Sequence, residues 1–316
     1  MPIIFDKGNQ SAKAGTELMM LYLQDHLDPK LQQSFSIGRA IKLFHKDTKK
    51  IYWCHNIPGQ RMPSEVMENA TLLSKDRWEL IDGIVFVSEW QRQLYIKHFN
   101  FTEEDIRHTK VLRNAIIPIE EHNKLNDKIR LIYTPVPFRG LDMLITAFEH
   151  LQKYHDNLEL EVFSSVQLYG VPAQIDQVLY RNLYQRLENN PDVIYHGTKP
   201  NNEVRDGLKR SHIFAYPSNY QETSCISLIE AMSAGCLCVH PNLAGLPETA
   251  GNQTMMYEYT TNKNDHINRF IGKMNEAITS VKDNEVNTTK QKQFADEQYS
   301  WDKRIIEWND YLKNLL

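Results

Sequence analysis

The sequence contains no long apolar run. No stretch approaches the roughly eighteen apolar residues that a membrane-spanning helix needs. The N-terminus, MPIIFDKGNQ, also lacks the basic region and apolar core of a signal peptide. No long block of one charge sign occurs and the net charge is only -4, so nucleic acid is not expected as a partner. We therefore expect a soluble, cytoplasmic chain.

Cysteine is scarce as well. Cys54 stands apart, and Cys225, Cys236 and Cys238 lie close together in the second half. Their spacing matches neither a disulfide framework nor a pair of zinc knuckles. We predict that all four cysteines are buried thiols.

Several catalytic motifs are missing. There is no Asp-x-Asp for a Mg²⁺ or Mn²⁺ clamp and no histidine-rich cluster for zinc. There is no G-x-S-x-G. The sequence also lacks G-x-G-x-x-G and G-x-x-x-x-G-K-[ST], which disfavours hydride transfer and nucleotide hydrolysis. We expect no metal and no cofactor.

What the sequence does contain is an alternation of strands and helices, the pattern of a parallel sheet covered by helices. The composition, 41% hydrophobic and 24% charged, fits a folded protein with room for two domains. The polar run 119–128 is the predicted hinge, which gives domains of 1–122 and 123–299. In the second, we predict strands at 129–134, 158–163, 192–197, 212–218 and 236–240, and helices at 140–154, about 173–190, 202–211 and 224–234.

The first half follows the same pattern on a smaller scale. Strands are predicted for PIIF (2–5), 50–55 and 83–88, and helices for 14–27, 64–81 and 89–99. The C-terminal segment 299–316 is an amphipathic helix with an apolar stripe that needs a partner surface. The stripe consists of Trp301, Ile305, Trp308, Leu312 and Leu315.

Two glutamates lie eight positions apart in SNYQETSCISLIEAMSAG (218–235). Glu222 follows a strand, where ligands of doubly wound folds bind. The backbone amides of Thr223, Ser224, Cys225 and Ile226 would open a helix and suit an anion such as phosphate. A carboxylate such as that of Glu230 can accept the two vicinal hydroxyls of a ribose or hexose. The spacing by itself is also compatible with chance.

The surroundings of this pair are more specific. The stretch 215–251 resembles the donor-binding signature of retaining GT-B glycosyltransferases of the family 4 type. Further similar stretches follow in the order of that family: VFVSEWQRQLYI, KVLRNAIIP, FRGLDMLITAFEHL, VIYHGTKPNNEVRDGLKRSHIFAYPS and YSWDKRIIEWNDYL. The resemblance implies an α/β protein of the GT-B fold. Two Rossmann-like, doubly wound domains would face a cleft, and the C-terminal helix, 300–316, would return to the first domain.

The resemblance also implies roles for residues of the second domain. Glu222 would lie beside the transferred sugar and Glu230 beside the ribose, with the amides of 223–226 near the donor. Arg139, in FRGL, matches a family lysine and could bind the pyrophosphate with its planar fork. Thr134 stands where the family commonly has an arginine, so one phosphate-binding cation is missing. The other interpretation of Arg139 is a solvated loop residue.

In the first domain the resemblance is weaker. Gly15 and Thr16 match a loop that faces the donor, and His55 matches a histidine near the sugar; each could instead be structural. Glu248 is either a nucleotide contact or a helix cap, with the cap favoured. The basic segment 38–50 contains Arg39, Lys42, Lys46, Lys49 and Lys50, which form a solvated face or contact an anionic acceptor or a membrane surface.

The resulting hypothesis is a metal-independent hexosyltransferase that moves a sugar from a nucleoside diphosphate to an acceptor hydroxyl with retention of configuration. The acceptor would be a glycan, a lipid-linked molecule or a protein. Two alternatives remain open: a nucleotide-sugar 2-epimerase of the same fold, and a nucleotide-sugar-binding protein with weakened catalysis.

Overall fold

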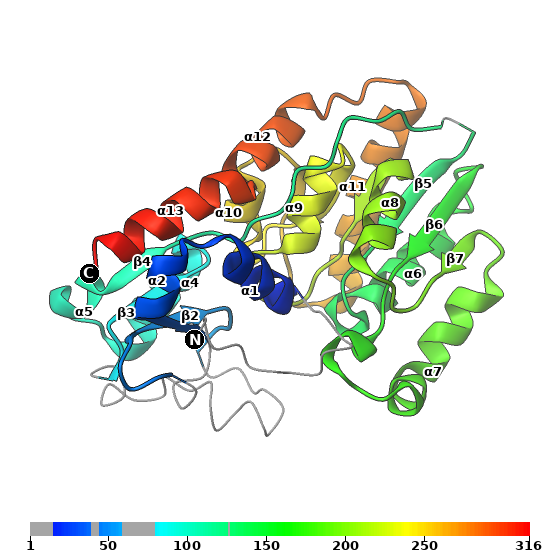
Figure 1. The fold of residues 1–316 in the computed structure, drawn as a ribbon. Helices are drawn as coiled ribbons and strands as arrows, with labels where there is room; N and C mark the ends of the chain where they lie inside the picture. Colours follow the sequence, from blue (N-terminus) through cyan, green and yellow to red (C-terminus); the bar gives the residue numbers. More distant parts are fainter. Residues whose placement is uncertain (1–14, 39–43, 59–79, 126) are drawn as a thin grey trace. The chain divides into compact units, whose positions relative to one another are not determined.

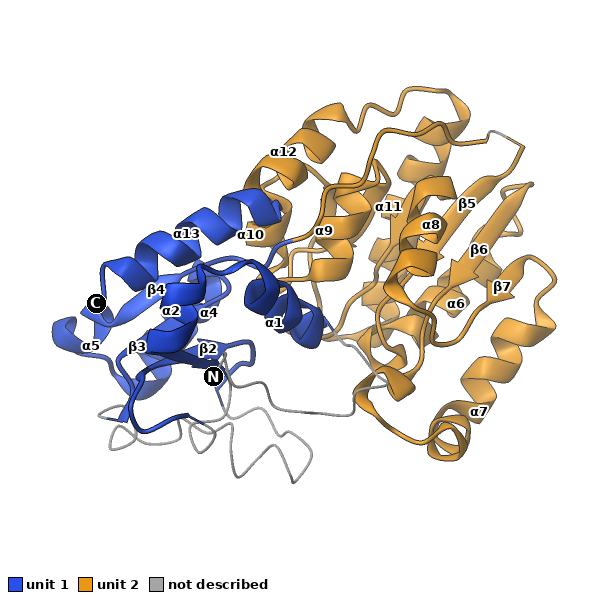
Figure 2. Cartoon of the chain, in the orientation of Figure 1, with its two compact units in different colours: residues 1–115, 299–316 blue, residues 116–298 orange. Residues whose placement is uncertain are grey.

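The protein consists of two compact units (Figure 2). Unit 1 comprises residues 1–115 and 299–316, and unit 2 comprises residues 116–298. The structure is a computed structural model, and it describes residues 15–38, 44–58, 80–125 and 127–316. The predicted strand 2–5 and nearly all of the predicted helix 64–81 lie outside the described residues.

The described part of unit 1 contains a parallel sheet of four strands in the order β1-β2-β3-β4. Helix α4 begins where the Ser88 side chain accepts a hydrogen bond from the amide of Gln91, and it ends at Asn100 in the left-handed conformation. The strands are β1 Phe35–Gly38, β2 Lys49–Cys54, β3 Gly83–Phe86 and β4 Thr109–Val111; the helices are α1 Gly15–His26, α2 Pro29–Ser34, α4 Glu89–Phe99, α5 Glu103–Arg107 and α13 Trp301–Lys313.

The C-terminal helix α13 finds its partner surface in unit 1 (Figure 1). The ring of Trp308 packs edge-on against Trp53 of β2 at a centroid distance of 5.0 Å, and Trp301 stacks on Tyr22 of α1 at 4.3 Å. Trp301, Trp308 and Leu312 of the predicted stripe are buried. The apolar period of the segment therefore identified a real contact face.

Unit 2 contains a parallel sheet with the strand order β10-β9-β8-β5-β6-β7 in the described residues. The chain builds β5, β6 and β7 outward in one direction and then returns to add β8, β9 and β10 on the other side of β5. β5 and β8 are thus neighbours at the point where the winding reverses. The strands are β5 Ile129–Tyr133, β6 Leu158–Val162, β7 Val193–Tyr195, β8 Ile213–Ala215, β9 Leu237–Pro241 and β10 Met255–Tyr257.

Helices cover both faces of this sheet, as the doubly wound prediction requires (Figure 1). α6 packs on α11 and α7, while α8 and α9 pack on each other. The apolar stripe of α6, whose helical spacing is visible in the sequence, is buried throughout: Leu141, Leu144, Ile145, Phe148 and Leu151. The helices are α6 Leu141–Leu151, α7 Ala173–Asn189, α8 Asn201–Arg210, α9 Ile226–Ser233, α10 Leu246–Ala250, α11 Lys263–Lys282 and α12 Thr289–Tyr299, with 3-10 turns η3 Pro137–Arg139 and η4 Val166–Tyr169.

The polar run 119–128, predicted as the hinge, lies inside unit 2, because the chain enters that unit at Ile116. Lys124 explains why this run is held in place. Its Nζ donates hydrogen bonds to carbonyls at the C-terminal ends of α8 and α9: those of Leu208, Lys209, Ser211 and Ala234. A lysine at such carbonyls satisfies acceptors that a helix leaves unpaired.

A smaller difference concerns the segment after β9. The stretch NLAGLPE, predicted as a loop, contains the short helix α10.

All four cysteines are free and buried, as predicted, and burial raises the pKa of Cys54 to about 12. Among the described residues, no helix combines the length and apolarity that crossing a bilayer demands.

His240, on β9, makes unit 2 sensitive to acid. It is fully buried, its ring nitrogens lie 2.9 Å from the Pro241 carbonyl and 2.8 Å from Thr254 Oγ1, and burial lowers its pKa from 6.5 to about 4. Between these two pH values His240 is protonated in the unfolded chain and neutral in the folded chain. The free energy of unfolding therefore decreases as the pH falls through this window. At pH 5, we expect a loss of about 2 kcal/mol from this group relative to pH 7.5.

Urea unfolding at the two pH values tests this expectation. His240→Gln should lose that part of the pH dependence, while the part due to His212 and His266, whose pKa values burial also lowers, should remain. Replacing the exposed His150 by Gln is the matched control and should leave the dependence intact. Equal slopes for His240→Gln and the wild type would contradict the assignment.

Candidate functional site

The site lies at the winding reversal of unit 2, where β5 and β8 run side by side. Arg139 follows β5 on the turn η3, and Glu222 lies in the loop after β8. Because the carboxyl ends of neighbouring parallel strands share one edge of a sheet, these residues meet although they are 83 positions apart in sequence.

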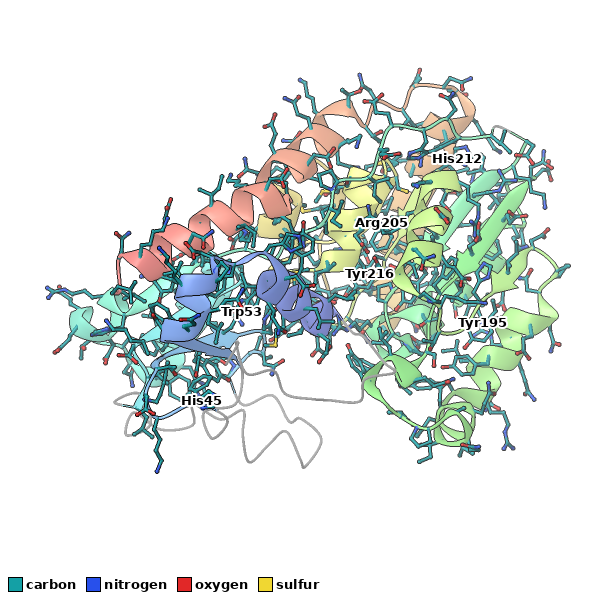
Figure 3. All side chains as sticks on the ribbon, in the orientation of Figure 1. His45, Trp53, Tyr195, Arg205, His212 and Tyr216 are labelled. Carbon is teal, nitrogen blue, oxygen red and sulfur yellow. The ribbon has the colours of Figure 1, made fainter. Side chains whose placement is uncertain are left out.

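Arg139 and Glu222 form an ion pair. Arg139 Nη1 donates to Glu222 Oε1 at 2.7 Å, and the side chains are 21% and 7% exposed respectively. The hydroxyl of Tyr216 donates to the same carboxylate oxygen (Tyr216 is labelled in Figure 3). Arg139 Nη2 donates to Tyr169 Oη at 3.0 Å, and the guanidinium carbon lies 4.4 Å from the ring centre of Tyr220. The interpretation of Arg139 as a solvated loop residue is therefore wrong.

The surroundings keep the guanidinium of Arg139 charged and the hydroxyl of Tyr216 protonated. Burial works to lower the pKa of Arg139, but the carboxylate of Glu222 and three nearby tyrosines outweigh it, so the pKa is raised well above its ordinary value. Burial, followed by the charge of Glu222, raises the pKa of Tyr216, which stays protonated and able to donate. Arg139 Nε is buried and has no hydrogen-bond partner among the described residues. One N–H of the guanidinium is thus not used by the contacts described above.

Thr134, at the end of β5, provides no second cation. Its Oγ1 is buried and has no hydrogen-bond partner in the part of the chain that the structure describes. The hydroxyl is therefore a polar atom left unsatisfied at this strand end. This makes Arg139 the cation on which an anionic ligand at this strand end would depend.

Glu230 lies on α9 and accepts hydrogen bonds from α8. Asn201 Nδ2 lies 3.2 Å and 3.4 Å from its two carboxylate oxygens, and Arg205 Nη1 lies 3.3 Å from Oε1. Burial raises the pKa of Glu230, while Arg205 and Asn201 act in the opposite direction. These long contacts leave acceptor positions for further donors. The sequence predictions did not include Asn201 and Arg205 as site residues. The predicted helix 202–211 contains Arg205 but begins one residue after Asn201, whereas α8 includes both at i, i+4 spacing.

The start of α9 differs from the prediction. The helix begins at Ile226 with Cys225 as N-cap, so Thr223 and Ser224 precede it. The loop before α9 is bonded to Gly245, whose amide donates to the Glu222 carbonyl at 2.8 Å. Burial raises the pKa of Cys225, so its thiol stays protonated. Of the four amides predicted to bind an anion, only that of Ile226 therefore lies in the first turn of α9.

The remaining predicted residues lie in other elements. His55 directly follows β2 in unit 1, half-buried, with its ring 4.8 Å from that of Trp53. Gly15 and Thr16 begin α1, also half-buried. Glu248 is in the first turn of α10. Of the basic segment 38–50, residues 39–43 lie outside the described residues, and Lys49 donates to the carbonyl of Leu315 beyond the end of α13, which is a structural contact.

In the part of the chain that the structure describes, no group of three or more His, Cys, Asp or Glu side chains is placed to hold a metal ion. The charged groups that converge at the winding reversal are instead the paired Arg139 and Glu222. Their arrangement can present one guanidinium to an anion and one carboxylate to hydroxyl donors.

The family described as "Glycosyl transferases group 1" matches residues 117–295, more than half of the chain. The chain belongs to the group 1 glycosyl transferases. The family predicted from the sequence is thereby confirmed. The matched region runs through unit 2 and includes all the residues of the Arg139–Glu222 and Glu230 clusters.

This group 1 glycosyl transferase is similar to known proteins at low identity. The phosphatidylinositol N-acetylglucosaminyltransferase GPI3 subunit of Saccharomyces cerevisiae is 22% identical over 244 residues, which cover 72% of this chain and 50% of the relative. The chain thus spans about half the length of this curated relative. TarM is 17% identical with a TM-score of 0.62, covering 94% of this chain and 58% of that one. HepE of Anabaena, solved in complex with UDP-glucose, is 14% identical with a TM-score of 0.62, covering 84% and 71%.

These structural similarities establish the fold. The α/β, GT-B prediction is confirmed by the two parallel sheets together with these glycosyltransferase structures.

Proposed function

We propose that this chain is a retaining hexosyltransferase that uses a nucleoside diphosphate sugar and requires no metal. The observation that carries the proposal is the Arg139–Glu222 pair at the winding reversal of the unit that matches the family. A cation and a carboxylate fixed side by side suit a ligand whose diphosphate and sugar hydroxyls are adjacent. HepE was solved with UDP-glucose, so a uridine donor is the first candidate.

In the proposed reaction, the diphosphate leaves the anomeric carbon and the acceptor oxygen bonds to that carbon from the same face. The proton of the acceptor hydroxyl passes to the departing diphosphate. Arg139 and the first-turn amides of α9 stabilise the charge that develops on the leaving group. Glu222 accepts hydrogen bonds from the sugar and Glu230 from the ribose, which holds the donor in the reactive position. The acceptor is a glycan, a lipid-linked molecule or a protein.

A panel of UDP-, GDP- and ADP-sugars in thermal unfolding tests the donor part of this proposal. A sugar nucleotide at one hundred times its Kd should stabilise the fold by about 2.7 kcal/mol, and so raise Tm by several degrees. Transfer to an acceptor should then persist in EDTA. A panel without any stabilising member would contradict nucleotide-sugar binding. Turnover that is lost in EDTA and restored by Mn²⁺ would contradict metal independence.

The roles of the two glutamates can be separated with UDP, which has a ribose and no sugar. Glu230→Gln should weaken UDP binding about tenfold, because a charge-assisted contact to the ribose is lost. Glu222→Gln should leave UDP affinity unchanged or raise it, because Arg139 loses a competing partner, while transfer from the intact donor falls. Titration calorimetry and initial rates measure the two effects.

The exposed Glu258 serves as the matched control, and Glu258→Gln should change neither quantity. Equal loss of UDP affinity in Glu222→Gln and Glu230→Gln would contradict the division of roles.

Thr134 favours a second candidate, a nucleotide-sugar-binding protein with weakened catalysis. With threonine in place of an arginine, the departing diphosphate would have less charge stabilisation than in related enzymes. Tight donor binding without transfer or hydrolysis would support this candidate.

A further inference from the structure

Helix α9 carries contacts to both segments that connect unit 2 with unit 1. The chain enters unit 2 through residues 116–119, here called the outgoing crossing. It leaves along the second half of α12, residues 292–298, here called the return crossing. Two residues of α9, Glu230 and Ser233, lie three positions apart and therefore share a face of the helix. Ser233 is bonded directly to both crossings, and Glu230 is linked to the outgoing crossing through Arg205.

Glu230 reaches the outgoing crossing through Arg205. The guanidinium of Arg205 contacts Glu230 Oε1 with Nη1 at 3.3 Å, while its Nη2 donates to the carbonyl of Ile117 at 2.9 Å. A longer contact of 3.4 Å reaches the carbonyl of Pro118. Figure 3 labels Arg205 on α8. Because a guanidinium is a rigid planar fork, a shift of the carboxylate at one side changes its contacts at the other.

Ser233 joins both crossings. Its Oγ accepts from the amide of Ile119 at 2.8 Å and donates to Asp296 Oδ1. Lys292 Nζ completes the network by donating to the carbonyl of Ile119, to that of Ser233 and to Asp296 Oδ2. Ile119 and Ser233 are buried. The crossings are thus bonded to each other and to the helix that presents Glu230.

We propose that Arg205 and Ser233 are positioning residues that couple the occupancy of Glu230 to the two crossings. The proposal rests on the proposed function in one respect only, namely that Glu230 binds the ribose of the donor. A ligand whose hydroxyls donate hydrogen bonds to Glu230 restricts the motion of its carboxylate. The guanidinium of Arg205 then keeps its hydrogen bonds to the outgoing crossing for a larger share of the time. Donor binding is transmitted in this way to the connections between the units.

Hydrogen exchange of the full chain without ligand tests the network directly, and the amide of Ile119 is the reporter. Glu230→Gln replaces a charged partner of Arg205 by a neutral amide of the same shape. Exchange at Ile119 should accelerate about fivefold, because a charge-assisted contact is about twice as strong as a neutral one. Arg205→Met should accelerate it at least as much. Amides of β6, which is outside the network, should not change, and this separates coupling from general destabilisation.

The control is Lys209→Met, on the same helix, because the Lys209 side chain pairs with Asp206 at 3.5 Å and is 38% exposed. It should leave Ile119 unaffected. Unchanged exchange at Ile119 in both Glu230→Gln and Arg205→Met would overturn the proposal, as would acceleration spread equally over β6.

A second arm adds saturating UDP. In the wild type UDP should slow exchange at Ile119, and in Arg205→Met it should bind without slowing it, whereas Arg205→Lys should recover part of the effect. Equal slowing in wild type and Arg205→Met would overturn the coupling. Should UDP fail to bind the wild type, the nucleotide part of the proposed function is contradicted, while the ligand-free arm still decides whether Glu230 and the outgoing crossing are coupled.

Discussion

Arg139→Ala should lower kcat/KM at least about tenfold and also destabilise unit 2. The loss of activity follows from the loss of one charge-assisted contact, which strengthens as charge develops on the diphosphate. The loss of stability follows from Glu222, which would remain buried without its cation. Breaking a pair of this kind costs about 2–4 kcal/mol, or several degrees in Tm.

A second substitution separates the two effects. Arg139→Ala combined with Glu222→Gln removes both charges, so much of the stability should return while transfer stays impaired. Arg139→Lys keeps the charge without the fork and should fall between wild type and Arg139→Ala. Initial rates and thermal unfolding of the four proteins provide the measurements. A near-normal rate for Arg139→Ala would remove this arginine from the proposed mechanism.

Gly140→Ala should be among the most destabilising single substitutions in unit 2. Gly140 has φ +111°, and a Cβ at this position would lie 2.2 Å from the carbonyl oxygen of Pro217. That oxygen belongs to the backbone that leads to Glu222, so relief requires moving one strand end away from the other. We expect a cost of about 3–5 kcal/mol, the sum of an unfavourable backbone conformation and a backbone clash.

Gly197 offers the matched control. It also has a positive φ, +65°, but no atom of the described residues lies within 4 Å of its Cβ position. Gly197→Ala should therefore cost only about 1 kcal/mol, from the backbone term alone. Denaturant unfolding of the two variants measures the difference. Similar losses in both would show that the close approach to Pro217 contributes little.

The sequence predicted the elements of unit 2 well because their periodicity is strong. The stripe of α6 and the alternation from β5 to β9 follow from local patterns. The Arg139–Glu222 pair required more, because it depends on the strand order that makes β5 and β8 neighbours, and no local pattern encodes that order.

Distant contacts also act where local preferences suggest something else. Ser224 is a preferred N-cap residue type, yet the N-cap of α9 is Cys225, after a loop bonded to Gly245. The run 119–128 has the composition of a linker, yet Lys124 and Ile119 tie it to helix ends and to Ser233.

Because all four cysteines are buried, their reaction with a thiol reagent can report the unfolding of each unit. Cys54 belongs to unit 1, whereas Cys225, Cys236 and Cys238 belong to unit 2. A thiol reagent can modify these side chains only after the surrounding unit opens, and the raised pKa of each reinforces this protection. Opening of unit 1 alone would therefore attach a single label, and opening of unit 2 alone would attach three. The stoichiometry of labelling, read as added mass on the intact chain, tells which unit unfolds first without any engineered probe.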